Sequence, residues 1–214
     1  YHSLLTPEIA AESQTQMEEM QRKGGMFFGT RPLCSVLRPR FLSTAQYHFL
    51  QRSLAAMMPA FEKATHAALH NDAIRAQLGL NDWEEQLIRF EHGYTAASPL
   101  GRMDEFYVPD MQGDGLGSLS MTEYNAEVPA APAYNALLTE MFSAMPIMRE
   151  FEKTYEVRPL HARHHTLNVL QDCYNQWRKT SKASGLAAKP RIGILDWKEV
   201  PTYSEFVMFR DFFM

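Results

Sequence analysis

Two pairs of polar residues carry the clearest chemical signal in this 214-residue sequence: Arg102 with Asp104, and Glu123 with Asn125. One residue intervenes within each pair, so in a β-strand both side chains would project from the same face. Carboxylate and amide oxygens suit Mg²⁺, which proteins hold with one or two carboxylates together with substrate phosphates. An arginine beside them could bind a phosphate oxygen. The same residues could instead form a solvated surface with weak ion pairs, and the spacing leaves both interpretations open.

The segment between the two pairs has the pattern of a β-hairpin. Residues 106–108 are a short β-prone run, and residues 119–123 alternate apolar and polar side chains. Residues 111–117 contain three glycines, which tolerate the positive φ that tight turns require. Paired strands would gather the arginine, the carboxylates and the amide on one face of a small sheet.

The spacing and the neighbours of these residues resemble those of the glutathionylspermidine synthase family of ATP-grasp ligases. The similarity lies in an Arg-x-Asp motif at 102–104, followed by the motif Glu-Tyr-Asn-Ala-Glu-x-Pro at 123–129. Three further stretches extend it over most of the chain: FGTRPL (28–33), LRPRF (37–41) and DWKEVPTYSEF (196–206). The whole chain resembles the N-terminal half of circularly permuted ATP-grasp proteins related to that family.

The resemblance implies an ATP-dependent ligase that joins a small-molecule carboxylate to an amine through an acyl-phosphate, with Mg²⁺ and ATP as cofactors. It implies that Arg102 contacts the transferring phosphate and that Glu127 helps to bind substrate. It also implies three ligands for the Mg²⁺ ions of Mg-ATP: Asp104, Glu123 and Asn125. The bacterial enzyme of the family holds glutathione with serines just after the asparagine. Val128 and Ala130 lie near those places here, which argues against glutathione as the substrate.

Three acidic residues near the end of the chain are candidates for contacts with a substrate amine: Asp196, Glu199 and Glu205. Residues 191–196 form a short apolar run ended by an acid, which predicts a buried strand followed by a helix from Ser204. An acid at the carboxyl end of such a strand often lines a ligand crevice. Glu205 could equally be a first-turn acid that complements the dipole of its own helix.

The histidines between residues 161 and 165 suggest a different chemistry. His161 and His165 are four residues apart, which on a helix can present both imidazoles to one zinc ion, as in a metal-dependent hydrolase. No glutamate of an HExxH motif lies between them, and no third ligand is obvious nearby. Structural or surface histidines are therefore the favoured interpretation.

Composition and charge exclude several classes of function. The net charge of −4 offers no general attraction to nucleic acid or to an anionic membrane. Cys34 and Cys173 form neither a CxxC metal motif nor a disulfide framework, and we expect buried thiols in a reducing compartment. The N-terminus lacks a signal-peptide pattern, and no apolar run approaches the roughly 20 residues that span a bilayer. We therefore expect a cytoplasmic protein that binds neither nucleic acid nor membrane.

The remaining pattern predicts a helix-rich α+β fold with a small sheet. Apolar periodicity predicts five longer helices, at about 7–24, 44–70, 133–145, 146–155 and 160–179. Pro59 should kink or split the second of them. Three regions are expected: a helical N-terminal region (1–95), the hairpin with the Mg-ATP site and further helices (96–180), and the start of an α/β segment (190–214).

The two α+β lobes that clamp the nucleotide in the ATP-grasp family are not recognisable in this sequence, which resembles the pre-ATP-grasp region. Residues 206–214 form an apolar helical run without a stop signal. We therefore expect the chain to continue beyond Met214, or to act with a missing half or a partner chain. The alternative to catalysis is a half-domain that binds a substrate or a partner.

Overall fold

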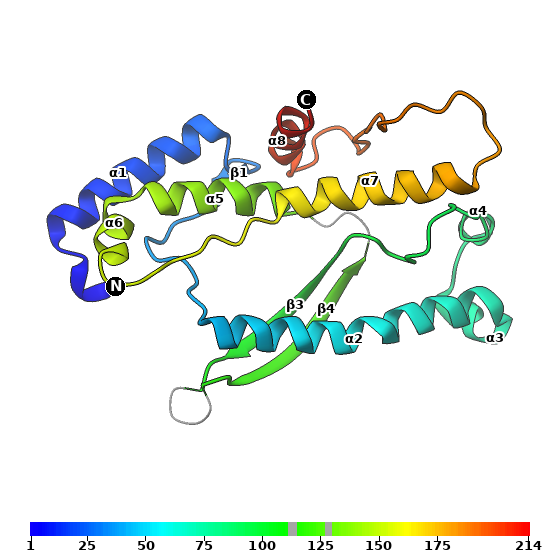
Figure 1. Ribbon diagram of the computed structural model, residues 1–214, viewed down its shortest axis with the longest axis horizontal. Helices are drawn as coiled ribbons and strands as arrows, with labels where there is room; N and C mark the ends of the chain where they lie inside the picture. Colours follow the sequence, from blue (N-terminus) through cyan, green and yellow to red (C-terminus); the bar gives the residue numbers. More distant parts are fainter. Residues whose placement is uncertain (111–114, 127–129) are drawn as a thin grey trace. The chain divides into compact units, whose positions relative to one another are not determined.

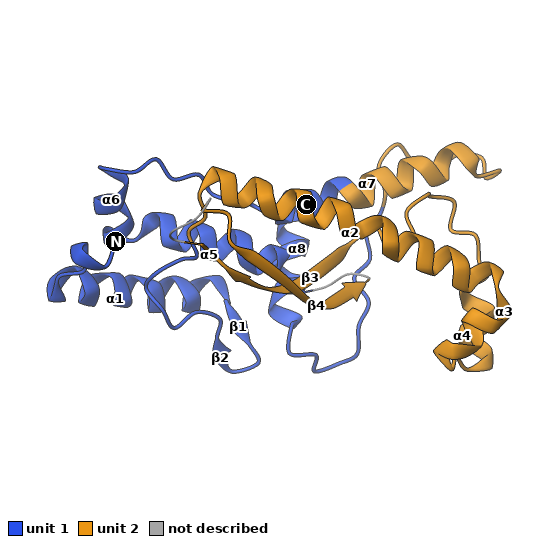
Figure 2. Cartoon of the chain, turned by 90° about the horizontal axis from the view of Figure 1, so that it is seen from below, with its two compact units in different colours: residues 1–40, 130–168, 191–214 blue, residues 41–129, 169–190 orange. Residues whose placement is uncertain are grey.

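The computed structural model describes residues 1–110, 115–126 and 130–214. This part of the chain is helix-rich and contains two antiparallel sheets of two strands each, which confirms the coarse prediction of an α+β fold (Figure 1). The chain forms two compact units, each built from separate stretches of sequence (Figure 2). Unit 1 contains residues 1–40, 130–168 and 191–214, and unit 2 contains residues 41–129 and 169–190.

Unit 1 is built mainly from helices. Its elements are η1 (His2–Leu4), α1 (Pro7–Gly24), β1 (Phe27–Phe28), β2 (Arg31–Pro32), α5 (Pro132–Ala144), α6 (Pro146–Glu152), the first residues of α7 (Arg163–Thr180), and α8 (Tyr203–Phe213). The Thr6 hydroxyl oxygen accepts a hydrogen bond from the backbone N–H of Ile9 at 3.3 Å, and Gly25 ends α1 with a φ of 63°. Both ends of α1 therefore lie where the cap and the glycine predict them.

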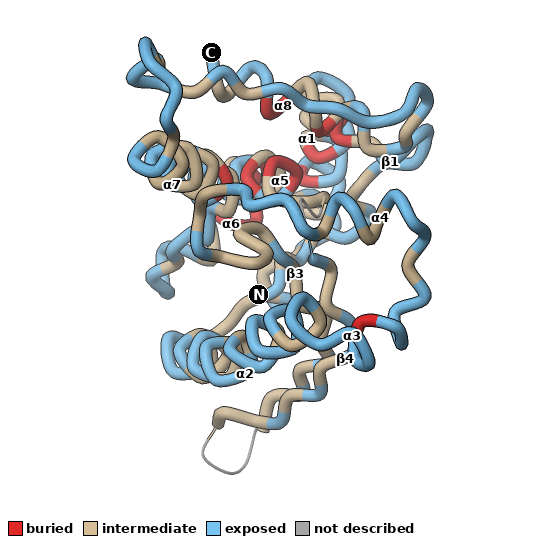
Figure 3. The backbone as a smooth tube through the Cα atoms, turned by 90° about the vertical axis from the view of Figure 1, so that its right-hand side faces the viewer, coloured by how far each residue is buried: buried red, intermediate tan, exposed pale blue. Residues whose placement is uncertain are grey.

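The core of unit 1 lies where α1 packs against α5 and α6, and where α5 packs against α8 (Figure 3). The apolar side chains of Met141, Met145 and Ile147 are completely buried there. A buried amide joins the neighbouring loop to this core. The amide nitrogen of Gln21 donates to the carbonyl of Cys34, and the amide oxygen accepts from the N–H of Cys34, both at 2.8 Å.

Unit 2 is organised around one long helix and the hairpin. Its elements are α2 (Thr44–His70), α3 (Asp72–Arg75), η2 (Ala76–Leu78), α4 (Asp82–Leu87), β3 (Gly101–Val108), β4 (Ser118–Ala126) and the rest of α7. A capping box begins α2, because Ser43 and Gln46 each accept a hydrogen bond from the backbone N–H of the other. Although α2 has 27 residues, no helix in the described stretches is long and apolar enough to cross a membrane.

Several local predictions are wrong. Of the kink or split predicted at Pro59, the split is absent, because α2 runs through Pro59 as one helix. The strand predicted at 191–196 is absent, and Leu195 is 97% exposed. An apolar run becomes a strand only where another strand can pair with its backbone, and the described residues provide none for this segment. The helix expected from Ser204 is present as α8. Cys34 and Cys173 are only partly buried.

The two units also differ from the three contiguous regions expected at 1–95, 96–180 and 190–214. Unit 1 joins both ends of the chain to its middle, because α5 packs against both α1 and α8. These contacts link segments more than 50 residues apart, and the composition along the chain does not predict them. The hairpin and the segment after residue 190 consequently belong to different units.

Candidate functional site

The β3–β4 hairpin brings the four predicted site residues onto one face. The strands are antiparallel, with Arg102 opposite Asn125 and Asp104 opposite Glu123. Directly opposed residues of an antiparallel pair share a face, and so do residues two apart along one strand. The hairpin predicted from the sequence is therefore present, and it gathers one arginine, two carboxylates and one amide.

The other face of the hairpin packs against α2. The ring centroid of Phe49 lies 6.4 Å from that of Tyr107, and the ring centroid of Phe61 lies 4.2 Å from that of Tyr124. Aromatic pairs at such separations pack favourably. Since α2 occupies this face, the four polar residues project from the opposite one.

A β-bulge lies beside the polar face. Asp104 is opposite Glu123, but the next residue, Glu105, is opposite Met121, so Thr122 is an extra residue in β4. The Thr122 hydroxyl donates a hydrogen bond to the carbonyl of Asp104 at 2.8 Å. Strict alternation would exchange the two faces of β4 beyond this point. Because of the bulge, the same face of β4 is directed toward α2 on both sides of Thr122.

Arg102 and Asp104 form an ion pair along β3. Nε of Arg102 lies 2.7 Å from Oδ1 of Asp104, and Nη2 lies 3.4 Å from Oδ2. The hydrogen bond from Arg102 lowers the pKa of Asp104 below its usual range, while burial opposes this effect and Asn125 adds a smaller lowering. The Asp104 carboxylate, ionised at neutral pH like any ordinary aspartate, therefore stays ionised to a lower pH.

Glu123 and Asn125 are less completely satisfied. Glu123 is exposed and faces the ionised Asp104, an arrangement that two carboxylates avoid unless a cation is near. The amide nitrogen of Asn125 is buried and makes no close hydrogen bond among the described residues, although it lies near enough to Asp104 to lower the pKa of that carboxyl slightly. A weakly satisfied donor directly opposite Arg102 suits an anionic oxygen, and the exposed Glu123 carboxylate suits a cation. The face thus has complementary features for a metal-bound phosphate.

A further carboxylate of the hairpin, Glu105, was missed by the sequence analysis. It shares the α2-facing side with Met121, which stands opposite it. Its Oε2 atom is buried and has no hydrogen-bond partner within the described part of the chain. Burial raises the pKa of Glu105. An acid between residues that face a helix is the sequence signal that could have identified it.

The acidic candidates near the C-terminus belong to unit 1, whereas the hairpin belongs to unit 2. Asp196 and Glu199 are exposed on the loop before α8. Asp196 accepts a hydrogen bond from the backbone N–H of Trp197 at 2.8 Å. Glu199 has a φ of 73°, which is uncommon for a residue other than glycine. Glu127, the remaining substrate-binding candidate, lies outside the described residues.

Glu205 has a different environment from these two acids. It is only 1% exposed, and its carboxylate accepts hydrogen bonds from the backbone N–H groups of Ala131 (3.0 Å) and Ala133 (2.9 Å). These N–H groups lie at the N-terminus of α5, so Glu205 caps α5. It therefore does more than complement the dipole of α8, the helix in whose first turn it lies. Ala131, with a φ of 110°, is held in place by this contact. The carboxylate is therefore engaged within unit 1 instead of being open to a substrate amine.

The histidine cluster does not have the geometry of a helical zinc site. Helix α7 begins at Arg163, so His161 precedes the helix and does not share a helical face with His165. His164 packs edge-on against Phe212 with the ring centroids 4.9 Å apart. In the stretches that the structure describes, no group of three His, Cys, Asp or Glu side chains is placed to hold a metal ion.

A scan against protein-family models and searches of curated proteins and of solved structures found no match for this chain. Its function is therefore inferred from the residues of the hairpin and their geometry.

Proposed function

We propose that this chain carries the Mg-ATP site of an ATP-dependent carboxylate–amine ligase of the ATP-grasp type, similar to glutathionylspermidine synthase. The observation that supports this most directly is the register of the hairpin, with Arg102 opposite Asn125 and Asp104 opposite Glu123. This register puts one guanidinium, two carboxylates and one amide on one face, and these are the groups that a phosphate and a cation would need. The motifs at 102–104 and 123–129 are the sequence features that resemble the family.

The reaction has two steps. An oxygen of the substrate carboxylate attacks the γ-phosphorus of ATP, the bond from that phosphorus to the bridging oxygen breaks, and an acyl-phosphate and ADP result. The amine nitrogen then attacks the acyl carbon, the bond from carbon to the phosphate oxygen breaks, and an amide, inorganic phosphate and a proton are released. Negative charge moves among phosphate oxygens in the first step, and fixed positive groups stabilise it.

Asp104, Glu123 and Asn125 would hold Mg²⁺ through two carboxylates and one amide oxygen. This donor set fits a hard cation that keeps part of its coordination for water and phosphate. When bound, Mg²⁺ neutralises part of the phosphate charge. An aspartate is already deprotonated at neutral pH, and Arg102 keeps Asp104 deprotonated to a lower pH because it lowers the pKa of that carboxyl.

Arg102 would donate hydrogen bonds to an oxygen of the transferring phosphoryl group. Its guanidinium now donates to Asp104, and 41% of the side chain is exposed, so a phosphate can approach it from solvent. Exchange of one anionic partner for another keeps the cation paired during the reaction. Asp196 and Glu199 are exposed acids of the kind that attract a substrate amine. Glu205 is left out because its carboxylate caps α5.

The test is the release of ADP from Mg-ATP in the presence of panels of small carboxylates and amines. Arg102→Ala should abolish acid-dependent ADP release while leaving the folded structure intact. Arg158→Ala is a matched control, because Arg158 also pairs with an acid two residues away, Glu156, and is 84% exposed. Turnover by Arg102→Ala at the rate of the unaltered protein would overturn the assignment.

The second candidate function is binding of a substrate or a partner without catalysis. The observation that favours it is the ion pair between Arg102 and Asp104, which occupies a proposed metal ligand and the proposed phosphate-binding residue together. Titration calorimetry with Mg-ATP separates the two functions. Tight nucleotide binding favours the ligase, whereas failure to bind nucleotide favours the half-domain that binds another molecule.

A further inference from the structure

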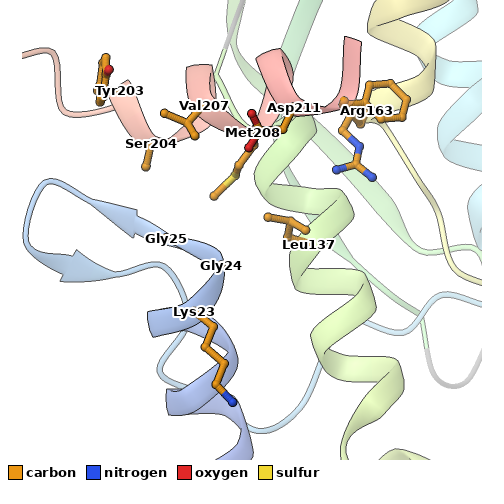
Figure 4. Close-up of a pocket in the computed structure, with 11 residues that line it drawn as sticks. Lys23, Gly24, Gly25, Leu137, Arg163, Tyr203, Ser204, Val207, Met208 and Asp211 are labelled. Carbon is orange, nitrogen blue, oxygen red and sulfur yellow. The ribbon is translucent and has the colours of Figure 1, made fainter. Parts of the chain in front are cut away.

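Unit 1 contains a cavity of about 650 Å³ beside α8 (Figure 4). Leu137 of α5, together with Val207 and Met208 of α8, supplies apolar lining, and Arg163, the first residue of α7, lies at one side with Phe212. The volume is within the range of about 300–1,000 Å³ that is typical of small-molecule sites. The cavity therefore combines an apolar wall with one largely buried cation.

Arg163 is the unusual residue of this cavity. Its side chain is only 17% exposed, yet its ion pair with Glu140 is long, at 3.5 Å from Nη2 to Oε1. The guanidinium carbon lies 4.3 Å from the centroid of the Phe212 ring. The Nε atom is buried and has no hydrogen-bond partner among the described residues. A buried guanidinium with so few acceptors carries an unfavourable desolvation cost.

Arg75 in unit 2 shows how a buried arginine is satisfied elsewhere in this chain. Its side chain is 6% exposed, and its Nε donates to both oxygens of Glu85 at 2.8 and 3.1 Å. It also pairs with Asp72 and donates to the backbone carbonyls of Ala68 and Leu69. Within the described ranges, Arg163 has one distant carboxylate, that of Glu140, where Arg75 has four partners. The difference indicates that an acceptor from outside the chain would complete the environment of Arg163.

We propose that this cavity binds an amphiphilic monocarboxylate, a molecule with one carboxylate and an apolar body. The carboxylate would accept hydrogen bonds from the partly exposed guanidinium group of Arg163. The apolar body would lie against Leu137, Val207 and Met208 and lose its contact with water there. The site lies within unit 1, and its occupation requires neither ATP nor the hairpin, so the proposal stands apart from the ligase function.

The other charged residues around the cavity agree with a single anionic group at Arg163. Lys23 lines the cavity, but its side chain is 80% exposed, pairs with Glu19 at 3.7 Å and points away from α8 (Figure 4). Asp211 also lines the cavity and pairs with the neighbouring Arg210 at 2.6 Å. Its negative charge disfavours a second carboxylate on that side. A ligand with one acid group and an uncharged tail is therefore the best match.

The test is a calorimetric titration of the full chain with decanoate, with decanol as the uncharged probe. We expect saturable binding of decanoate at one site, and binding at least about tenfold weaker for decanol, which lacks the charge-assisted hydrogen bonds. Arg163→Gln should weaken decanoate binding by about tenfold or more. Arg158→Gln removes an exposed arginine from the same unit and should change binding by less than about twofold.

Two further variants keep the proposal testable if Arg163→Gln does not fold. Val207→Trp fills the cavity and should abolish decanoate binding while Arg163 remains. Glu140→Gln removes the competing acid and should tighten binding severalfold. The proposal is overturned by an absence of saturable binding at about 1 mM decanoate, the weak end of specific affinity. It is equally overturned if decanol binds as well as decanoate, or if Val207→Trp binds like the unaltered protein.

Discussion

Asp104 and Glu123 stand directly opposite each other on β3 and β4, so two carboxylates share one cross-strand position of the hairpin. Opposed side chains of this kind have Cβ atoms about 4.5–5.5 Å apart, and like charges there destabilise the pair. Arg102 offsets the repulsion by binding Asp104, while Glu123 remains exposed. A face that tolerates this arrangement is suited to a bound cation.

We expect Glu123→Gln to raise the melting temperature by about 1–3 °C in metal-free buffer, because it removes the repulsion from Asp104. Mg²⁺ should raise the melting temperature of the unaltered protein but not that of the variant. Differential scanning calorimetry with and without Mg²⁺ measures both effects. Glu91→Gln, which neutralises an exposed acid elsewhere in unit 2, is the control. A variant that keeps the full response to Mg²⁺ would show that Glu123 is not a ligand.

Arg102 should control the titration of Asp104. The pKa of folded Asp104 is lowered from 3.8, so the unfolded chain takes up the proton first as the pH falls. The resulting stabilisation of the folded state is complete above the pKa of Asp104 in the unfolded chain. It is lost as the pH falls through the lower pKa of Asp104 in the folded protein. In Arg102→Gln the pKa should rise towards 3.8, as observed by carbon NMR of the carboxyl group. An unchanged Asp104 pKa in this variant would mean that the ion pair does not form in solution.

Glu105 should have the opposite dependence on pH. Burial raises the pKa of folded Glu105 above 4.5. The contribution of Glu105 to the stability of the folded state is therefore most favourable below pH 4.5 and is lost as the pH rises through the raised pKa. Glu105→Gln should therefore be more stable than the unaltered protein at neutral pH and similar to it in acid. Urea denaturation at about pH 4 and pH 7 measures this difference. If Glu105→Gln changed the stability equally at both pH values, the Glu105 carboxylate would have to be solvated in the folded protein.

Loss of the Glu205 carboxylate should destabilise unit 1. Glu205→Ala leaves the N–H groups of Ala131 and Ala133 without their acceptor, at a cost of about 1–3 kcal/mol. Urea denaturation gives the change in the free energy of unfolding. Glu12→Ala replaces an exposed acid on α1 and should change it by less than about 0.5 kcal/mol. Unaltered stability combined with weaker amine binding would instead support a substrate contact for Glu205.

The sequence alone determined the features that depend on neighbouring residues. Helix α1 begins after Thr6 and ends before Gly25, and α2 begins after Ser43. The sequence predicts these ends because caps and left-handed residues act within a few positions of the chain. The hairpin and the shared face of Arg102 and Asp104 follow from turn glycines and from the two-residue period of a strand. These are local interactions, so their signals are readable without knowing the fold.

Tertiary structure decided everything that depends on distant partners. Glu205 caps a helix that begins more than 70 residues earlier, and no local pattern reports that contact. The apolar run at 191–196 is not a strand, because strand formation needs a second backbone to accept and donate its hydrogen bonds. The surroundings of Arg163 arise only when α5, α7 and α8 meet. Burial and the pairing of charges are set by packing between distant segments, so only the folded chain reveals them.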